Sequence, residues 1–386
     1  MNTEKIKLFF QGRKGLLPRI EAACKGQRDI IWFHVASYGE FEEARPVIEA
    51  TRERFPQRKI LLTVFSPTVY IPMQHYPLVD WVFYLPLDTP WNVRRFLNAV
   101  RPVKAIFTIT DFWPVLLHEL RRRKIDTYIM SVHIEAGNHH LKWYDFLFRS
   151  IFRNCYTCVM VQDQESRQLL EGIGVPRIQV TGDPRMDRVM AVAEQKWNHP
   201  ILDDWCGGEK VFVAGSTYPP ENQMLLEIAN AHPQGKFLVV PHEIAQGQVN
   251  ALLEGARYGA TRFTDYHPGA QILVVDTVGM LSRLYRYAYA AYVGGAFTEG
   301  APHSVVEPAS YGMPVSVGPQ YKRDSHCRDL VALGAAFPVS HRQDLEDFYL
   351  KVTSDTAFRE QSGRKAADYC RSHAGATEAI MKIIFG

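Results

Sequence analysis

Residues 30–40 read Ile-Ile-Trp-Phe-His-Val-Ala-Ser-Tyr-Gly-Glu, a run of large apolar residues that ends in a small, glycine-containing turn. The run predicts a buried strand over residues 30–34, and the helical pattern of residues 40–54 follows after a short turn. Parallel α/β folds are built from such strand-to-helix turns. The turn also places Glu40 at a helix N-terminus, where the helix dipole stabilises a carboxylate.

This turn allows two interpretations of Glu40. Dipole stabilisation alone accounts for many acidic residues in a first helical turn. Ser37 and Gly39, just before it, favour a functional carboxylate, because glycine allows close backbone approach and exposes the neighbouring side chain. We therefore expect Glu40 at the edge of the sheet where α/β proteins bind their ligands.

The alternation of strands and helices continues along the chain. Further strands in the first half are predicted over residues 59–64, 81–84, 105–108, 127–131, 158–162 and 178–181. After a polar passage at residues 195–208, strands are predicted over residues 210–213, 236–240, 272–275, 290–293 and 314–317. The pattern predicts two doubly wound, Rossmann-like domains, residues 1–195 and 196–386, facing each other across a ligand-binding cleft. The last helix is expected to pack back on the N-terminal domain.

Composition excludes several classes of protein. Lys and Arg number 44 against 41 Asp and Glu, so no nucleic-acid partner is indicated. No apolar run reaches the ~18 residues needed to span a bilayer. The start of the chain, residues 5–19, interleaves cations with large apolar residues, which leaves contact with a membrane surface open. For the basic cluster at residues 121–124, a solvated helix end and a second membrane contact both stay open.

The cysteines indicate a reduced, cytosolic protein. Six are present, and only Cys155 and Cys158 lie close together in the sequence. No second CxxC or nearby His pair completes a zinc site, and the segment around Cys158 has the pattern of a buried strand. We expect core thiols rather than a metal or redox pair.

Two stretches of the second half have the pattern of phosphate-binding turns. Ala214-Gly-Ser-Thr217 joins a strand to a helix, where unpaired backbone N–H groups and the Ser216 and Thr217 hydroxyls suit a phosphate. The stretch lacks both GxGxxG and a Walker lysine, and a simple helix cap is the alternative. In residues 292–314 a strand runs into Gly294 and Gly295, and a helix is predicted to start near His303.

Glu307 follows one turn into that predicted helix. N–H groups at a helix start can hold a phosphate, while a carboxylate farther along can accept hydrogen bonds from ribose hydroxyls. The stretch therefore suits a sugar nucleotide.

The order of motifs along the chain resembles that of the 3-deoxy-D-manno-octulosonic acid (Kdo) transferase family, from about Phe10 onward. The motifs are Ser37-Tyr-Gly-Glu40, Asp111-Phe-Trp-Pro114, Thr181-Gly-Asp-Pro-Arg-Met-Asp187, Ala214-Gly-Ser-Thr217, Pro241-His242, Asp276-Thr-Val-Gly279, Gly294-Gly295, His303-Ser-Val-Val-Glu307 and Gly318-Pro319. The resemblance implies the two-domain GT-B fold and inverting transfer of Kdo from CMP-Kdo to a lipid A precursor. It implies no active-site metal and no cofactor, since the CMP-sugar is a substrate. It also implies Glu40 as the general base.

The motifs give a candidate site. Besides Glu40, the residues expected to bind the acceptor are Ser37, Gly39, Asp111 and Trp113. Those expected to bind the donor are Ser216, Thr217, His242, Gly279, Gly294, Gly295, His303, Ser304 and Glu307. The resemblance further implies a cytoplasmic protein at the surface of the inner membrane. Members of the family often have a hydrophobic N-terminal anchor, and residues 5–15 resemble the piece just after one.

The sequence departs from the family's common pattern at several positions. Asp111 replaces a Glu, Ser304 an Asn and His242 an Arg, and a common Asn-Ala-Arg-x-Ser motif is replaced by Ser131-Val-His-Ile-Glu135. Loss of an Arg and gain of an acid bear on the usual anionic acceptor. Two alternatives therefore stay open: a GT-B relative with another nucleotide sugar or acceptor, and a non-catalytic paralogue. His139 and His140 are interpreted as part of an exposed loop, with acceptor contact as the alternative.

Overall fold

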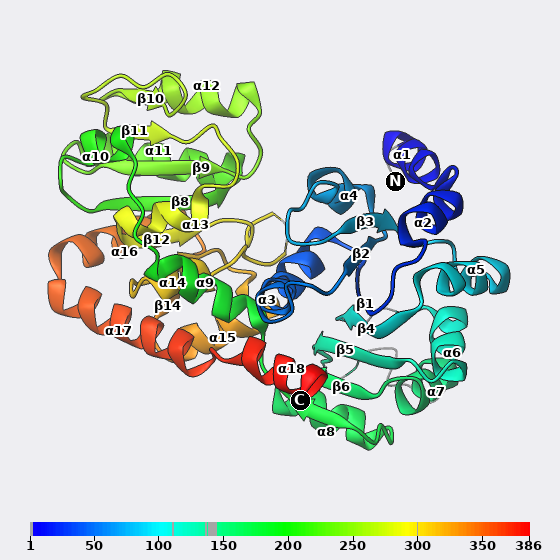
Figure 1. Cartoon of the computed structure of the whole chain (residues 1–386). Helices are drawn as coiled ribbons and strands as arrows, with labels where there is room; N and C mark the ends of the chain where they lie inside the picture. Colours follow the sequence, from blue (N-terminus) through cyan, green and yellow to red (C-terminus); the bar gives the residue numbers. More distant parts are fainter. Residues whose placement is uncertain (1–2, 110–111, 136, 138–144, 299) are drawn as a thin grey trace. The chain divides into compact units, whose positions relative to one another are not determined.

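The computed structural model describes residues 3–109, 112–135, 137, 145–298 and 300–386. The chain forms two compact units, Met1–Asp187 with Ala374–Gly386, and Arg188–His373 (Figure 1). The break falls inside helix α9 (Pro184–Glu194) rather than in the polar passage where the sequence suggested it. The reason is that Val189 and Arg188 already interact with unit 2: the Val189 carbonyl accepts a hydrogen bond from Ser310 at 3.5 Å.

Unit 1 is built on a seven-stranded sheet in the order β3-β2-β1-β4-β5-β6-β7, and every pairing in it is parallel. Its strands are β1 (Ile30–Val35), β2 (Ile60–Val64), β3 (Trp81–Tyr84), β4 (Pro102–Thr108), β5 (Asp126–Val132), β6 (Cys158–Val161) and β7 (Ile178–Val180). From β1 the chain adds β2 and β3 on one side of the sheet, and it then returns to the other side of β1, where it adds β4 to β7. The switch point of the sheet therefore lies between β1 and β4. In parallel α/β sheets, ligands bind at the carboxyl ends of the strands at such a switch point.

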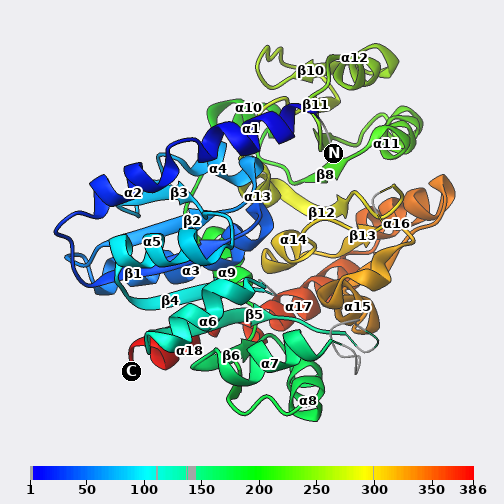
Figure 2. The ribbon, with the colours of Figure 1, turned by 90° about the vertical axis from the view of Figure 1, so that its right-hand side faces the viewer.

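Helices cover both faces of this sheet (Figure 2). One face carries α2 (Leu16–Cys24), α5 (Pro90–Val100), α6 (Pro114–Arg122) and α7 (Phe146–Asn154). The other carries α3 (Tyr38–Arg54) and α4 (Pro67–Met73), against which α1 (Thr3–Arg13) packs. Helix α8 (Gln164–Gly172) connects β6 to β7. Since both faces are covered, the central strands β1 and β2 are buried throughout and mostly apolar.

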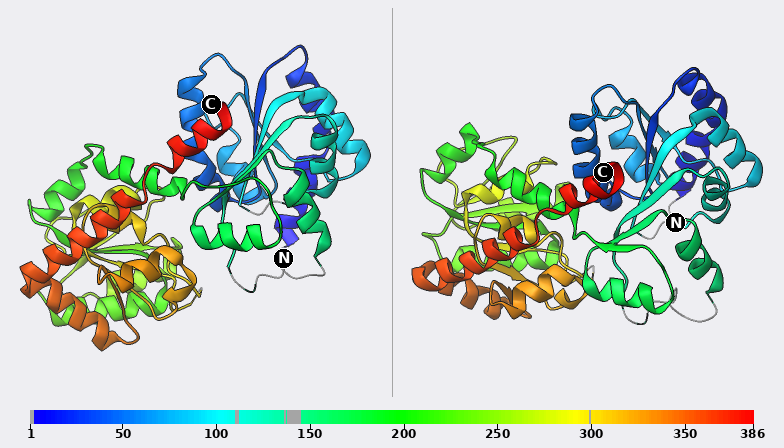
Figure 3. Two further views of the ribbon diagram at one scale, coloured as in Figure 1. Left: turned by 90° about the horizontal axis from the view of Figure 1, so that it is seen from below. Right: turned by 60° about the horizontal axis from the view of Figure 1, so that its bottom comes forward.

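The last helix, α18 (Ala376–Phe385), belongs to unit 1 although it follows the whole of unit 2 in sequence (Figure 3). It lies against α3, where the Thr51 hydroxyl meets the Met381 sulfur at 3.4 Å. The Asp187 carboxylate accepts hydrogen bonds from the backbone N–H groups of Gly375 and Thr377 at the start of the helix. Apolar packing and this cap fix the helix to the unit.

Unit 2 repeats the architecture with a second parallel sheet in the order β10-β11-β9-β8-β12-β13-β14. Its strands are β8 (Val211–Thr217), β9 (Phe237–Pro241), β10 (Ala260–Arg262), β11 (Ile272–Val274), β12 (Ala288–Val293), β13 (Val315–Val317) and β14 (Ala336–Pro338). Here the switch point lies between β8 and β12. Among the described strands, the two edge strands β10 and β14 were not predicted from the sequence; their residues, Ala260–Arg262 and Ala336–Pro338, do not form a run of large apolar residues.

The helices of unit 2 also form two layers. One contains α11 (Pro219–Ala231), α12 (Gln246–Gly255) and α16 (Arg342–Ser354), and the other contains α14 (Val306–Ser310), α15 (Ser325–Ala332) and α17 (Thr356–Ser372). The remaining helices are α10 (Pro200–Cys206) and the single turn α13 (Leu281–Leu284). Successive β8 residues alternate between two cores: Phe212 packs beneath α11, and Val213 packs with Trp205 of α10.

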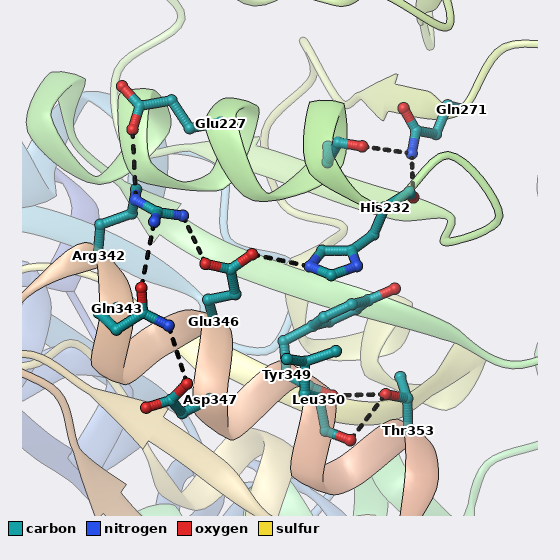
Figure 4. A network of polar contacts seen from close by, with 11 residues as sticks. Glu227, His232, Gln271, Arg342, Gln343, Glu346, Asp347, Tyr349, Leu350 and Thr353 are labelled. Atoms are coloured by element: carbon teal, nitrogen blue, oxygen red, sulfur yellow. Dashed lines mark hydrogen bonds and ion pairs between the residues drawn. The ribbon is translucent and has the colours of Figure 1, made fainter.

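A polar network fastens α16 to α11 (Figure 4). The Glu346 carboxylate accepts hydrogen bonds from His232 at 2.9 Å and from Arg342 at 2.6 Å, and Arg342 also lies 3.7 Å from Glu227. These contacts lower the pKa of Glu346. The neighbouring Tyr349 ring packs on His232, so apolar and charged contacts act together at this junction.

Two further expectations can be compared with the structure. Each of the six cysteines is buried and forms no disulfide, so the prediction of core thiols is confirmed. Within the described part of the chain, no helix has the length and apolar character needed to cross a membrane.

Candidate active site

Glu40 lies just beyond the carboxyl end of β1, at the switch point of unit 1. Ser37 is the N-cap of α3 and accepts a hydrogen bond from the Glu40 N–H at 3.3 Å, while Glu40 Oε2 accepts one from the Ala36 N–H at 2.5 Å. The side chain is half-buried. Burial raises its pKa, and the hydrogen bonds from Ala36 and Ser37 oppose that rise. Glu40 is therefore oriented by backbone donors and partly accessible, and its raised pKa makes it a stronger base than an ordinary carboxylate.

Gly39 is not required by the surrounding protein. A Cβ atom there would meet only Ser37 Oγ at 3.9 Å, which is an ordinary contact. The space around Gly39 within unit 1 is therefore open. That a ligand approaches the backbone at Gly39 stays a prediction.

A cluster of polar residues adjoins Glu40. This cluster was not predicted from the sequence. Glu43, one helical turn further along α3, is buried, as is Asp183 in the loop after β7. Arg185 donates two hydrogen bonds to Asp183 Oδ2, from Nε at 2.8 Å and from Nη2 at 2.6 Å, and its Nε lies 3.6 Å from Glu43 Oε1. Asp183 and Arg185 stand inside a motif that was noted only for its order. Nothing in the local sequence connects them to Glu43.

Trp113, predicted to bind the acceptor, is half-buried at the N-cap of α6. Its ring contacts Phe65, with centroids 4.9 Å apart, and His34, at 5.7 Å. Its indole nitrogen is buried and has no hydrogen-bond partner among the described residues. Asp111, the other predicted contact on this loop, lies outside the described residues.

The side chain of Arg13, at the end of α1, contacts the same region of unit 1. Its guanidinium donates to the carbonyls of Phe65, at the end of β2, and Leu85, at the end of β3, at 3.0 and 3.2 Å. It also lies over the Phe9 ring, 3.7 Å from the centroid, and burial lowers its pKa to about 10. The helix that carries Arg13 is thereby tied to the strand ends beside Trp113.

In unit 2, the predicted donor residues gather at the carboxyl ends of β8 and β12. Ser216 is half-buried and has a positive φ of 55°, which is unusual for a residue with a side chain. Thr217 is fully buried, and its hydroxyl has no hydrogen-bond partner within the part of the chain that the structure describes. Of the two predicted hydroxyls, only that of Ser216 is accessible without rearrangement.

Glu221 fixes the glycine loop to this turn. It is fully buried: Oε2 accepts from the Tyr218 N–H at 2.8 Å, and Oε1 accepts from the Tyr292 hydroxyl at 2.9 Å and the Gly295 N–H at 3.0 Å. Gly294 allows this approach, because a Cβ atom there would lie 2.3 Å from the Ser216 carbonyl oxygen. Gly295 has a φ of 105°. Both glycines are required by the fold.

Three aromatic rings are stacked at this edge. The His242 and His303 rings lie 4.4 Å apart and nearly parallel, and Tyr218 stacks on His242 at 5.0 Å. Tyr218 also meets His303 Nε2 through its hydroxyl at 3.1 Å. Burial, and then the neighbouring His242, lower the pKa of His303 to about 4. The structure thus brings together two predicted residues and adds Tyr218, while Gly279 lies in the exposed loop after β11.

Glu307 and Ser304 follow the glycine loop. The predicted helix start near His303 is wrong: α14 begins at Val306, so Glu307 lies in its first turn rather than one turn in. The intervening stretch is tied back to the strand end, since the His303 N–H donates to the Gly294 carbonyl at 2.9 Å. Burial raises the pKa of Glu307 to about 7, while Arg188 and the Ser304 hydroxyl oppose the rise.

The segment that replaces the family's Asn-Ala-Arg-x-Ser motif has partners of its own. His133 Nδ1 lies 2.8 Å from Asp163 Oδ2, and His133 Nε2 lies 3.8 Å from Glu135 Oε1. The contact with His133 contributes to an Asp163 pKa of about 2. This acidic environment after β5 differs from the basic one that the usual motif would give.

Solved structures share this fold. UDP-GlcNAc 2-epimerase from Neisseria meningitidis aligns with a TM-score of 0.64 at 14% identity, covering 92% of this chain and 98% of that one. MurG from Acinetobacter baumannii aligns with a TM-score of 0.59 at 12% identity, covering 93% and 99%. At such low identity these matches show the fold alone, which is the predicted GT-B type.

Sequence comparison identifies the family. Residues 10–188 match the family model described as 3-deoxy-D-manno-octulosonic-acid transferase (kdotransferase). The 3-deoxy-D-manno-octulosonic acid transferase of Haemophilus influenzae is 26% identical over 368 residues, 92% of this chain and 86% of that protein. The transferase of the same name from Aquifex aeolicus is 26% identical, over 89% of each chain. Over about nine tenths of its length this chain is thus similar to Kdo transferases, and the resemblance predicted from its motifs is confirmed.

Proposed function

We propose that this protein is an inverting glycosyltransferase that moves Kdo from CMP-Kdo to a lipid A precursor in lipopolysaccharide biosynthesis. The observation that carries the proposal is the Glu40 carboxylate, held by backbone donors at the switch point of unit 1 with a raised pKa. Similarity to the Kdo transferases supports the donor and the type of reaction.

Glu40 acts as the general base. In the transfer, an acceptor hydroxyl oxygen bonds to the anomeric carbon of Kdo as the bond from that carbon to the CMP phosphate breaks. The proton of the hydroxyl passes to Glu40, and the electron pair of the broken bond leaves with CMP. A carboxylate whose pKa lies above the ordinary value accepts that proton more readily.

Unit 2 binds the donor. The Ser216 hydroxyl, at the β8–β12 switch point, is the candidate donor to the CMP phosphate, and the stacked His242 and His303 rings support a donor site at this edge of the sheet. Glu307, in the first turn of α14, is the candidate acceptor of ribose hydrogen bonds.

The acceptor side belongs to unit 1, with Ser37 and Trp113 beside Glu40. The helix α1 exposes Phe10 by 63% and carries Lys7, and the exposed Lys14 follows it. Apolar and cationic side chains together suit an anionic lipid surface. This supports a peripheral location at the cytoplasmic face of the inner membrane, where a lipid A precursor is reached.

Replacing Glu40 tests the base. Glu40→Gln keeps the size of the side chain but cannot take a proton, so transfer from CMP-Kdo to a tetra-acylated lipid A precursor should fall ~100-fold or more. Mass spectrometry of the product measures the rate. Glu53→Gln, an exposed position on the same helix, is the control and should leave the rate unchanged. Full turnover by Glu40→Gln would exclude the base.

Ligand titration separates the proposal from its alternatives. CMP should raise the melting temperature of the protein and UDP should not, because only a ligand that binds the native state stabilises it. Stabilisation by UDP alone would indicate another nucleotide sugar. CMP binding without transfer would indicate a non-catalytic paralogue.

We further propose that transfer uses no metal ion. Leaving-group charge would then be met by N–H groups and side chains of unit 2 alone. Transfer should be undiminished after dialysis against a strong chelator. A loss of activity that added Mg²⁺ restores would contradict this.

A further inference from the structure

Glu43 is a second carboxyl group directly behind Glu40. It follows Glu40 by three residues on α3, so the two side chains project from the same side of the helix. Glu43 is only 5% exposed, and among the described residues its Oε2 atom has no hydrogen-bond partner. The charged and polar groups that face it are Glu40 on α3, Ser131 at the end of β5, and Asp183 and Arg185 after β7.

The cation in this cluster is already engaged. Arg185 directs both Nε and Nη2 at Asp183 Oδ2, within 2.8 Å, whereas its approach to Glu43 is a single 3.6 Å contact. Asp183 is itself only 4% exposed and needs this partner. Among the described residues, the Arg185 guanidinium faces two buried carboxyl groups and approaches that of Glu43 less closely, and a buried carboxylate without a close cation is strongly disfavoured.

The neutral form of Glu43 relieves this imbalance. Burial raises the pKa of Glu43 to about 8. Arg185 and the Ser131 hydroxyl oppose the rise, and the negative charges of Asp183 and Glu40 add to it. The contacts of Glu43 and its raised pKa both indicate that its carboxyl group keeps its proton near neutral pH.

We propose that Glu43 is a positioning residue that stays protonated while Glu40 is ionised, so that the pair carries one negative charge and carries it on Glu40. The inference rests on the proposed role of Glu40 as the base. A second negative charge behind Glu40 would raise the pKa of Glu40 and leave less of the base in its reactive form. It would also repel the anionic donor.

The stability of the protein tests the proton without any assay of transfer. A carboxyl group whose pKa is higher in the folded than in the unfolded chain destabilises the fold as pH rises between the two values. The melting temperature of Glu43→Gln minus that of the wild type should therefore increase from about pH 4.5 to about pH 8 and stay level above it. Glu53→Gln should show no such trend. A pH-independent difference for Glu43→Gln would overturn the proposal.

Infrared spectroscopy of the wild-type protein provides a second measurement. A carbonyl stretch of a protonated carboxyl should be present at pH 7, disappear above about pH 8, and be absent from Glu43→Gln. A wild-type protein without the band at pH 7 would refute the protonated state even if Glu43→Gln failed to fold.

The pH profile of transfer tests whether the proton on Glu43 affects the reaction. Above about pH 8 the wild type gains the second negative charge and Glu43→Gln does not, so kcat/KM of the variant relative to wild type should rise between pH 7 and pH 9. Parallel profiles would contradict the positioning role. If Glu40→Gln were fully active, the proposed function would fail instead, while the infrared and stability results would still decide the protonation of Glu43.

Discussion

At the scale of single residues, buried side chains with no part in the chemistry hold the groups that would perform it. Glu221 is the clearest case. Its two carboxylate oxygens accept from Tyr218, Tyr292 and Gly295, so one residue fastens the start of α11 to the loop after β12. The loop can lie this close only because residue 294 has no side chain.

Gly294→Ala should therefore damage the donor site. Its Cβ would lie 2.3 Å from the Ser216 carbonyl oxygen and 2.5 Å from Glu221 Oε2, so backbone must move. We expect a loss of about 2 kcal/mol or more in unfolding free energy and a marked fall in CMP affinity. Denaturant titration and calorimetry measure the two effects. Gly247→Ala, where an added Cβ meets nothing within 4 Å, should leave CMP binding intact. Equal behaviour of both variants would refute the close-packing argument.

At the scale of elements, helices bring functional groups to the strand ends. Helix α3 carries Glu40 and Glu43 on one side, so a single helix sets the spacing of the base and its buried neighbour. Arg13 connects helix α1 to two strand ends of the sheet. The Arg13 guanidinium reaches the Phe65 and Leu85 carbonyls and packs on aromatic rings, including that of Tyr84.

Arg13→Ala should loosen α1 and weaken acceptor binding while sparing donor binding. The variant loses the hydrogen bonds to both strand ends and the cation–π contacts with Phe9, Phe65 and Tyr84. Faster amide exchange in α1 and a severalfold higher KM for the lipid acceptor are expected, with an unchanged KM for CMP-Kdo. Lys14→Ala, at the exposed next position, is the control. An unchanged exchange rate in α1 would show that other contacts hold the helix.

At the scale of the whole molecule, the same plan is used twice. Each unit has a seven-stranded parallel sheet with one switch point, and Glu40 in unit 1 and Ser216 in unit 2 lie at the carboxyl end of a strand at that point. The chain, however, passes between the two units twice. It enters unit 2 inside α9 and returns to unit 1 for α18, so the end of the sequence completes the unit that the start began.

Ile380→Asp should therefore unfold unit 1 selectively. Ile380 is fully buried in the core that includes β1 and β2, and an unpaired carboxylate there should cost several kcal/mol. Hydrogen exchange should lose protection at residues 30–64 and keep it at residues 211–241. Lys382→Gln, exposed on the same helix, should leave both regions protected. Loss of protection in residues 211–241 alone would place α18 with unit 2.

The local pattern of the sequence was sufficient to predict much of the fold. All twelve predicted strands are present, and Glu40 lies at the strand-to-helix turn that residues 30–40 indicate. These features depend on neighbours a few residues apart: apolar runs favour buried strands, and a serine cap starts a helix. The glycine loop was recognised for the same reason. The short helix α14 was placed three residues too early, because the contact between His303 and Gly294 that holds the preceding stretch is not local.

What the sequence alone determined is thus the repeated α/β pattern and the position of Glu40 within it. Only the tertiary structure decided which residues surround that carboxylate. Glu43, Ser131 and Arg185 come from three separate segments, and Tyr218, His242 and His303 from three others. Burial and charge at such clusters are set by chain segments that fold together from distant positions. No pattern within one segment contains that information, because desolvation and pairing depend on the whole set of neighbours.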